Sequence, residues 1–370
     1  MGTPGDEGVT RAGMMDGEKE GSRMPSLRTL VAIPVSLALL FAPLTTGSAS
    51  SAEARDPLLS QFVTKGGAPA AALLDRDGDD VRYAAAGQGI ARADRFRAGS
   101  ITKTFVATVV LQLAAEHRLS LSDTVERYLP GLLRGRGVDG RRITLRALLS
   151  HTGGLADFAT VTRGEVPLTP LQAVRISLSL PSNRLGHFAY SSTDYVVLGM
   201  VIRQVTGHSY ATEVRRRVIT PLRLTGTSFP GARTTLPSPH GRAYAADGSD
   251  VTELDPRVAG AAGELVTTLD DLDRFYAALL DGELLPPRRL REMLDTRAAH
   301  GAYGLGIFPV KLPCGITVWG HNGRIAGSYV RSAVSIGGRH VLTFRVNTTA
   351  IADPALEPAL LAAEFCPRDR

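Results

Sequence analysis

Lysine is scarce in this 370-residue chain, because only Lys19, Lys65, Lys103 and Lys311 are lysines among its 42 basic residues. Arginine cannot replace lysine where a side chain must accept and release a proton. Its guanidinium stays charged at any working pH, whereas a desolvated ammonium can lose its proton. Each remaining lysine is therefore informative.

Other absences narrow the function. The chain has no basic helix, no interleaving of basic and aromatic residues and no zinc-finger spacing, which argues against nucleic-acid binding. It also lacks H-E-x-x-H, a cysteine–histidine cluster and a G-x-x-x-x-G-K loop, so we expect no metal and no organic cofactor. The net charge of +6 is spread along the chain and suits an anionic environment such as a bacterial cell wall.

One long apolar run is present, at residues 26–44, where about fifteen residues are apolar and arginines lie upstream. A small-residue stretch follows, and Ala52-Glu53-Ala54 is a plausible cleavage site of a secretory signal peptide. A membrane anchor is the alternative, but Pro34 and the short length argue against it, since a span needs about 20 residues. We expect residues 1–54 to be a leader and signal peptide, with no stable membrane anchor and a secreted, extracellular or cell-wall protein.

The chain has two cysteines, Cys314 and Cys366. Two cysteines in an exported protein often pair. A bridge would close a loop of about 50 residues, which the chain-entropy model values at roughly 4 kcal/mol. The alternative is two free, buried thiols.

Apolar patterning predicts strands at residues 70–74, 81–85, 316–319, 328–336 and 340–346, with a hairpin turn at Gly337-Gly338. Helical periodicity and capping residues predict helices at 56–63, 105–117, 143–150, 169–180, 194–207, 210–220, 268–280, 287–296 and 354–365.

This order of elements indicates an α+β fold in which the first and last strands share one sheet. We expect a catalytic domain at residues 55–370. Its α/β lobe would comprise about 55–122 and 245–370, and its helical lobe about 123–244. A cleft between the lobes is the expected site.

Ser100 and Lys103 form an S-x-x-K sequence at the start of the predicted helix after residue 99. A serine and a lysine three residues apart share one helix face, which is a way to build an activated hydroxyl nucleophile. The alternative is that Ser100 simply caps the helix.

Tyr190-Ser191-Ser192 lies at the mouth of the helix predicted at 194–207. A tyrosine beside a cation could shuttle a proton, and the Ser192 hydroxyl could bind the lysine or a substrate amide. The alternative is a packed aromatic ring followed by a helix cap, Ser192 or Thr193.

His321-Asn322-Gly323 follows the strand predicted at 316–319. A strand edge there can pair with an extended substrate and leave the N–H of Arg324 free to face an oxyanion. A second H-x-G, His151-Thr152-Gly153, ends a predicted helix and is interpreted as a glycine C-cap. We therefore assign the strand copy to the site.

Together, S-x-x-K, Y-x-S and H-x-G resemble the penicillin-recognising serine hydrolases, the serine β-lactamase and D-alanyl-D-alanine carboxypeptidase family, and among them the class C β-lactamases. The resemblance implies a β-lactamase/transpeptidase-like fold, with an antiparallel sheet flanked by helices, an all-helical lobe and the active site between them. It implies that Ser100 forms an acyl-enzyme, that Lys103 and Tyr190 transfer its proton, and that the N–H groups of Ser100 and Arg324 hold the oxyanion.

The resemblance also implies a substrate. The first interpretation is a monomeric D-alanyl-D-alanine carboxypeptidase that acts on peptidoglycan peptides and reacts with β-lactams, without a cofactor. Alternatives are an esterase, a β-lactamase or a D-amino-acid amidase, or a non-enzymic protein that binds penicillin or peptidoglycan.

Three departures from the family pattern concern the substrate. Ser192 replaces an asparagine, Asn322 replaces a threonine, and Phe308 stands where the carboxypeptidases carry an arginine for the substrate carboxylate. Arg324 could supply that charge instead.

Overall fold

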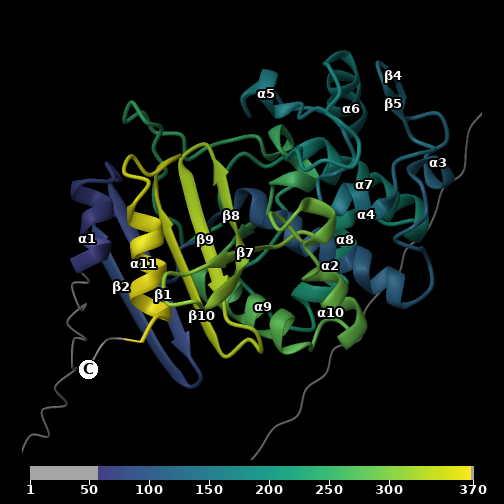
Figure 1. Ribbon diagram of the computed structural model, residues 1–370. Coiled ribbons are helices and arrows are strands. Elements are labelled where there is room, and N and C mark those ends of the chain that lie inside the picture. Colours follow the sequence, from purple (N-terminus) through teal and green to yellow (C-terminus); the bar gives the residue numbers. More distant parts are fainter. Residues whose placement is uncertain (1–56, 368–370) are drawn as a thin grey trace, which may run out of the picture. The chain divides into compact units, whose positions relative to one another are not determined.

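Residues 57–367 are described by a computed structural model of the protein (Figure 1). They belong to one compact unit, Ser51–Arg370. The predicted signal segment at 26–44 and the cleavage site at 52–54 lie outside the described residues.

A six-stranded antiparallel sheet forms the centre of this unit. Its strand order is β2 (Asp80–Gly87), β1 (Ala70–Asp77), β10 (His340–Val346), β9 (Ser328–Val334), β8 (Thr317–Ile325) and β7 (Phe308–Lys311). Strand β1 pairs with β10, and Leu73 lies opposite Phe344. The first and last parts of the chain therefore share one sheet, as the sequence predicts.

Both faces of the sheet are covered, which explains the continuous apolar run of β1. On one face, Leu73 and Phe344 pack with α1 (Pro57–Thr64) and α11 (Leu356–Phe365). On the other, Leu74 belongs to the larger core that includes α2 (Thr102–Ala115) and α9 (Leu269–Asp281). Figure 1 shows α1 and α11 on the side of the sheet opposite α2 and α9.

The remaining helices are α3 (Val125–Tyr128), α4 (Leu145–Leu149), α5 (Ala159–Thr162), α6 (Pro170–Ser179), α7 (Ser192–Thr206), α8 (Tyr210–Val214) and α10 (Pro287–Met293). Most of them lie around α2, whereas α5 and α6 lie at the upper edge of the molecule (Figure 1). The predicted caps of two helices are confirmed: Thr169 and Gln172 form a capping box before α6, and Gly207 ends α7 in the left-handed conformation.

Helix α2 carries the S-x-x-K lysine and is buried around its circumference, with only Gln112 and Ala115 partly exposed. Its sequence is apolar on all sides, as expected of a helix enclosed by core. Phe105 stacks on Phe275 of α9, with ring centroids 3.7 Å apart. This packing fixes the turn that precedes the helix.

Several predicted boundaries are wrong. Strand β1 continues to Asp77, and strand β2 already begins at Asp80. The connecting turn is tight because Gly78 adopts φ +61°. The helix predicted at 210–220 changes after Val214 into a π-helical segment, Arg215–Ile219. The N-cap of α7 is Ser191, not Ser192 or Thr193.

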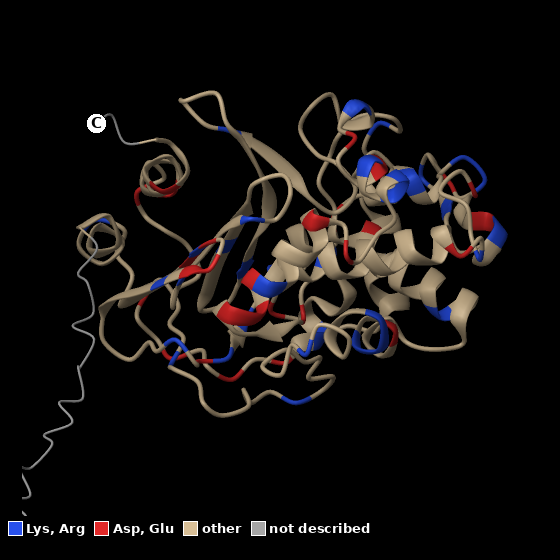
Figure 2. Cartoon of the chain, turned by 90° about the horizontal axis from the view of Figure 1, so that it is seen from below, with Lys and Arg blue, Asp and Glu red and all other residues tan. Residues whose placement is uncertain are grey.

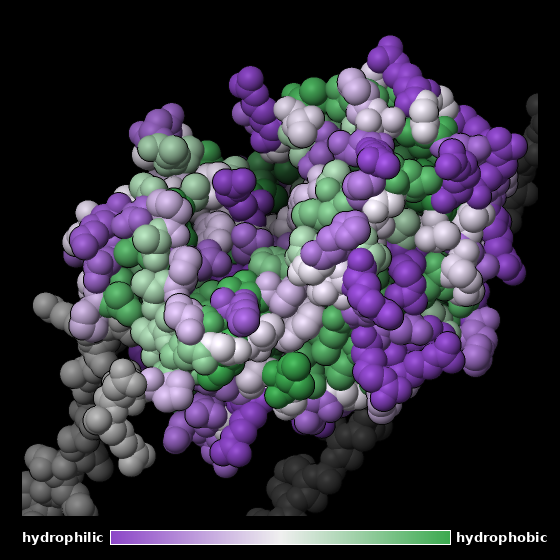
Figure 3. Space-filling model, in the orientation of Figure 1, coloured by the Kyte–Doolittle hydropathy of each residue, from purple (hydrophilic) through white to green (hydrophobic). Residues whose placement is uncertain are grey.

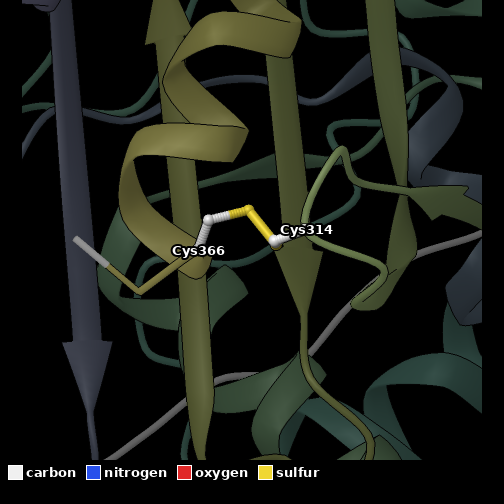
Figure 4. The surroundings of a disulfide bond; sticks show 2 residues. All are labelled: Cys314 and Cys366. Atoms are coloured by element: carbon white, nitrogen blue, oxygen red, sulfur yellow. A yellow bond between two sulfur atoms is a disulfide. The ribbon is translucent and has the colours of Figure 1, made fainter. Parts of the chain in front are cut away.

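Cys314 and Cys366 form a disulfide with a Cα–Cα distance of 5.8 Å. The bridge joins the turn between β7 and β8 to the end of α11 (Figure 4). It closes a sequence separation of 52 residues and so ties the C-terminal helix to the sheet.

The surface is mixed in charge and in polarity. Figure 2 shows acidic and basic residues interspersed, with no large region of one sign in that view. On the face shown in Figure 3, hydrophobic residues form small separate areas among hydrophilic ones. Within residues 57–367, no helix is long and apolar enough to cross a membrane, and no group of His, Cys, Asp or Glu could hold a metal ion.

Candidate active site

Ser100 and Lys103 face one another. Ser100 lies in a 3-10 turn, η1 (Gly99–Ile101), that runs directly into α2. The Nζ of Lys103 lies 3.0 Å from the Oγ of Ser100 and donates a second hydrogen bond of 2.8 Å to the carbonyl oxygen of Ala262. Lys103 is fully buried, and no acidic side chain among the described residues forms an ion pair with it. Its Nζ is therefore held between the serine hydroxyl and the Ala262 carbonyl.

Two glycines allow strand β8 to lie against this turn. Gly99 has φ +51°, and a Cβ on it would lie 2.7 Å from the backbone nitrogen of Arg324. A Cβ on Gly323 would lie 1.8 Å from the carbonyl oxygen of Ala98. Any larger residue would push the strand away. The backbone of Arg324 thus lies beside the Ser100 turn, as the H-x-G motif predicts.

Tyr190 precedes α7 and borders the lysine. The Nζ of Lys103 lies 4.9 Å from the centroid of the Tyr190 ring and 5.7 Å from that of Tyr195. Tyr190 is 37% exposed, so one side of the ring remains accessible. Ser192, the first residue of α7, lines the same cavity of about 300 Å³ as Ser100.

His321 lies inside β8 rather than after a strand, because β8 continues to Ile325. Its Nδ1 contacts the carbonyl oxygen of Asn322, so Nδ1 carries the hydrogen and Nε2 accepts from the Tyr303 hydroxyl at 2.7 Å. Burial, with the charge of Lys103, lowers the pKa of His321 to about 3. The imidazole is therefore neutral and supplies shape and hydrogen bonds rather than charge.

The side chain of Asn322 does not point to Ser100. Successive strand residues face opposite sides of a sheet. Asn322 donates a hydrogen bond of 3.3 Å to the hydroxyl of Tyr329, which packs with Val318 against the α1 and α11 face. The side-chain amide of Asn322 is therefore bonded away from the Ser100 cavity, and only the backbone of this residue borders the site.

Phe308, at the position where the carboxypeptidases carry an arginine, offers no positive charge, and the neighbouring Arg331 does not replace it in the Ser100 cavity. The Phe308 ring lies in β7, 5.2 Å from the His321 ring by centroids. The guanidinium of Arg331 lies 4.4 Å from the centroid of the Phe308 ring. However, Arg331 is fully buried and forms an ion pair with Glu357 at 3.5 Å. Arg331 is not among the residues that line the Ser100 cavity.

The sequence interpretation missed the importance of His151. Its ring lies 4.3 Å from the Tyr190 ring by centroids, and its carbonyl oxygen accepts a hydrogen bond of 2.9 Å from the N–H of Ala189. The predicted glycine C-cap is wrong, since His151 itself takes the left-handed conformation at φ +56°. In the sequence, the second H-x-G triplet was the only sign that His151 could matter. The contact between His151 and the segment that carries Tyr190 depends on tertiary packing, which the sequence does not show.

The charge state of His151 follows from its partners. Its Nδ1 accepts the N–H of Ser191 at 3.3 Å and lies 2.9 Å from the Oδ2 of Asp194. Burial lowers the pKa of His151 and raises that of Asp194, each far from its ordinary value. Both shifts favour the uncharged form of each group, and Nδ1 has a single lone pair for its two contacts, while Nε2 of His151 and Oδ1 of Asp194 are buried without a hydrogen-bond partner. The pair is a neutral support that positions the loop carrying Tyr190.

Ser100 and the backbone of Arg324 thus line one cavity, with the buried Lys103 behind the serine and the Tyr190 ring beside the lysine. The cavity is lined by two charged residues, Arg163 and Arg324, and both are arginines. This arrangement can activate a hydroxyl and stabilise a developing negative charge.

Comparisons with known proteins agree with this geometry. The model of the family described as Beta-lactamase matches residues 55–355. The penicillin-binding protein 4 of Amycolatopsis lactamdurans is 30% identical over 242 residues, which cover 60% of this chain and 61% of that protein. The chain spans less than two thirds of the length of the first curated relatives it matches.

Two solved structures are similar over most of their length. A D-stereospecific amidohydrolase from Streptomyces sp. is 39% identical with a TM-score of 0.77, covering 84% of this chain and 98% of that chain. A D-amino acid amidase from Ochrobactrum anthropi SV3 is 27% identical with a TM-score of 0.73, covering 82% and 94%. The chain therefore belongs to the Beta-lactamase family and has an α+β, β-lactamase-like fold.

Proposed function

We propose that this protein hydrolyses amide or peptide bonds that follow a D-amino-acid residue, through an acyl-enzyme on Ser100. The observation that carries the proposal is the 3.0 Å contact between the Ser100 Oγ and the buried Lys103 Nζ at the wall of a ligand-sized cavity. The 39% identity with a D-stereospecific amidohydrolase supports the D configuration of the acyl group.

In this mechanism the Oγ of Ser100 attacks the substrate carbonyl carbon. Its proton passes to the neutral Nζ of Lys103, and the ammonium formed there stabilises the negative charge of the tetrahedral intermediate, while Tyr190 relays the proton to the leaving amine. The N–H groups of Ser100 and Arg324 hold the oxyanion, and the loss of one such donor typically costs about 10²–10³ in rate. When the carbon–nitrogen bond breaks, the amine leaves with that proton, and water then hydrolyses the ester.

A second candidate, D-alanyl-D-alanine carboxypeptidase, is favoured by a specific observation. The charged residues that line the Ser100 cavity are Arg163 and Arg324. A substrate that ends in a carboxylate would find attraction there and no repelling acid. Phe308 and Asn322 weigh against this candidate, since neither offers a group to the carboxylate.

The disulfide supports a further part of the proposal, which is export to the cell wall or the medium. Disulfides persist in oxidising compartments and are rare in the cytosol. Secretion would be tested by locating the processed chain in the culture medium or wall fraction and sequencing its N-terminus. A chain that stays reduced and unprocessed inside the cell would contradict export.

The substrate test compares D-phenylalaninamide, L-phenylalaninamide and a peptide that ends in D-alanyl-D-alanine. We expect turnover of the D-amide well above the L-amide, and no turnover of either by Ser100→Ala. Faster release of D-alanine from the peptide would favour the carboxypeptidase, and Arg324→Ala should then raise KM for the peptide more than for the amide. Inertness on all three, with saturable binding to peptidoglycan, would favour a non-enzymic binding protein.

A further inference from the structure

A second cavity lies behind the wall of the active site. It has a volume of about 260 Å³ and is bounded by α6, α7, the start of α8 and the segment 257–264. Its walls are largely apolar and include Leu168, Val196 and Met200. Phe158 and Ala259 line both this cavity and the one at Ser100, so a single layer of chain separates the two.

One acidic side chain faces this apolar space. Glu264 is 6% exposed and lines the cavity, and its Oε1 accepts a hydrogen bond of 2.6 Å from the Tyr210 hydroxyl. Among residues 57–367, no other side chain donates a hydrogen bond to it. Burial raises the pKa of Glu264 to about 7. A buried carboxyl with spare acceptor capacity is costly unless a donor pairs with it.

The chain on both sides of Glu264 contacts the nucleophile turn. The carbonyl oxygen of Ala262 accepts the 2.8 Å hydrogen bond from Lys103. The N–H of Leu265 donates to the Oγ1 of Thr102 at 3.1 Å, and its carbonyl oxygen accepts from the N–H of Ala98 at 2.7 Å. Glu264 therefore belongs to the segment that holds Lys103 in place.

We propose that this cavity is a binding site for a small apolar primary amine, distinct from the acyl-transfer site. The apolar body fills the space among α6 and α7, and the ammonium donates to the carboxyl of Glu264. An apolar amino acid and a simple aryl-alkyl amine share this chemistry. The amino acid adds a carboxylate, which Arg203 at the cavity wall can attract. Occupancy of the cavity alters the hydrogen bond between Ala262 and Lys103 and so the acylation of Ser100.

The binding test uses phenethylamine and the full chain, measured by calorimetry. Ser100→Ala is included because binding must survive there if the site is separate. Glu264→Gln should weaken binding about tenfold or more, since a hydrogen bond to a charged group is worth about 1.5–3 kcal/mol. Glu283→Gln, a matched change at an exposed position, should leave binding unchanged. Phenethyl alcohol should bind wild type and Glu264→Gln alike, which isolates the charge.

A second variant keeps the test decisive if Glu264→Gln fails to fold. Met200→Trp narrows the cavity from α7 and should abolish phenethylamine binding while Glu264 remains. D-phenylalanine and L-phenylalanine, compared with phenethylamine, report whether Arg203 adds affinity for a carboxylate. Arg203→Ala should remove any such advantage.

Three outcomes would overturn the proposal. They are no saturable binding of phenethylamine, equal affinity in Glu264→Gln, and loss of binding in Ser100→Ala. Saturating amine should change the rate of acylation by about fivefold or more, and an unchanged rate would refute the coupling to Lys103. The binding assay needs no turnover, so it stands even if the proposed amide hydrolysis fails.

Discussion

The buried carboxyl of Glu264 should give this protein a distinctive dependence of stability on pH. Its pKa is raised from 4.5 to about 7 in the folded state, chiefly by burial. Between these values the unfolded chain has released the proton while the folded chain still holds it. The folded state therefore binds more protons, and stability falls as the pH rises through this window and levels off above about pH 7.

The expected magnitude follows from that difference. At about 1.4 kcal/mol for each pH unit, the change from 4.5 to about 7 corresponds to a loss of roughly 3 kcal/mol of unfolding free energy. Glu264→Gln keeps an acceptor for the Tyr210 hydroxyl but cannot ionise. The stability of the variant relative to wild type should therefore rise by about 3 kcal/mol from pH 4.5 to pH 8.

Urea unfolding followed by circular dichroism, at several pH values, measures this difference directly. Glu283→Gln is the matched control, because it makes the same substitution at an exposed glutamate. A difference between Glu264→Gln and wild type that stays constant with pH would refute the reasoning, as would one that shrinks as the pH rises.

Three other changes test the site and its support. Lys103→Arg should lower kcat/KM by about 10²–10⁴-fold in amide hydrolysis, because a permanently charged guanidinium cannot exchange a proton with Ser100; activity within threefold of wild type would contradict a proton-transfer role. His151→Ala should lower kcat by roughly 10- to 100-fold with KM little changed, since the loop that carries Tyr190 loses its anchor; an effect on KM alone would count against positioning. Replacing both Cys314 and Cys366 by alanine should cost about 4 kcal/mol of unfolding free energy by the chain-entropy model for this loop, and unchanged urea unfolding would show that the bridge contributes nothing.

The sequence predicted the elements of the fold well because their signals are local. Thr169 with Pro170 starts α6, and Gly207 ends α7, as capping preferences require. The predicted ends of strands were wrong where pairing with a strand distant in the sequence determines how far the strand extends. Strand β8 continues through His321 to Ile325 because β9 pairs with it along that whole length, which no local pattern reveals.

The site was predictable in part for the same reason. Ser100 and Lys103 are one helical turn apart, so their contact follows from spacing alone. The support of Tyr190 by His151 and Asp194 joins residues about 40 positions apart, and only packing brings them together. Likewise, the direction of the Asn322 side chain depends on the register of β8 within the sheet.

The central claim is that the Oγ of Ser100 becomes covalently acylated. Mass spectrometry of the intact protein after incubation with a β-lactam, followed by peptide mapping, tests it most directly. We expect one added acyl group, located on the peptide that contains Ser100, and none in Ser100→Ala. An adduct on another residue, or amide hydrolysis that persists in Ser100→Ala, would contradict this account.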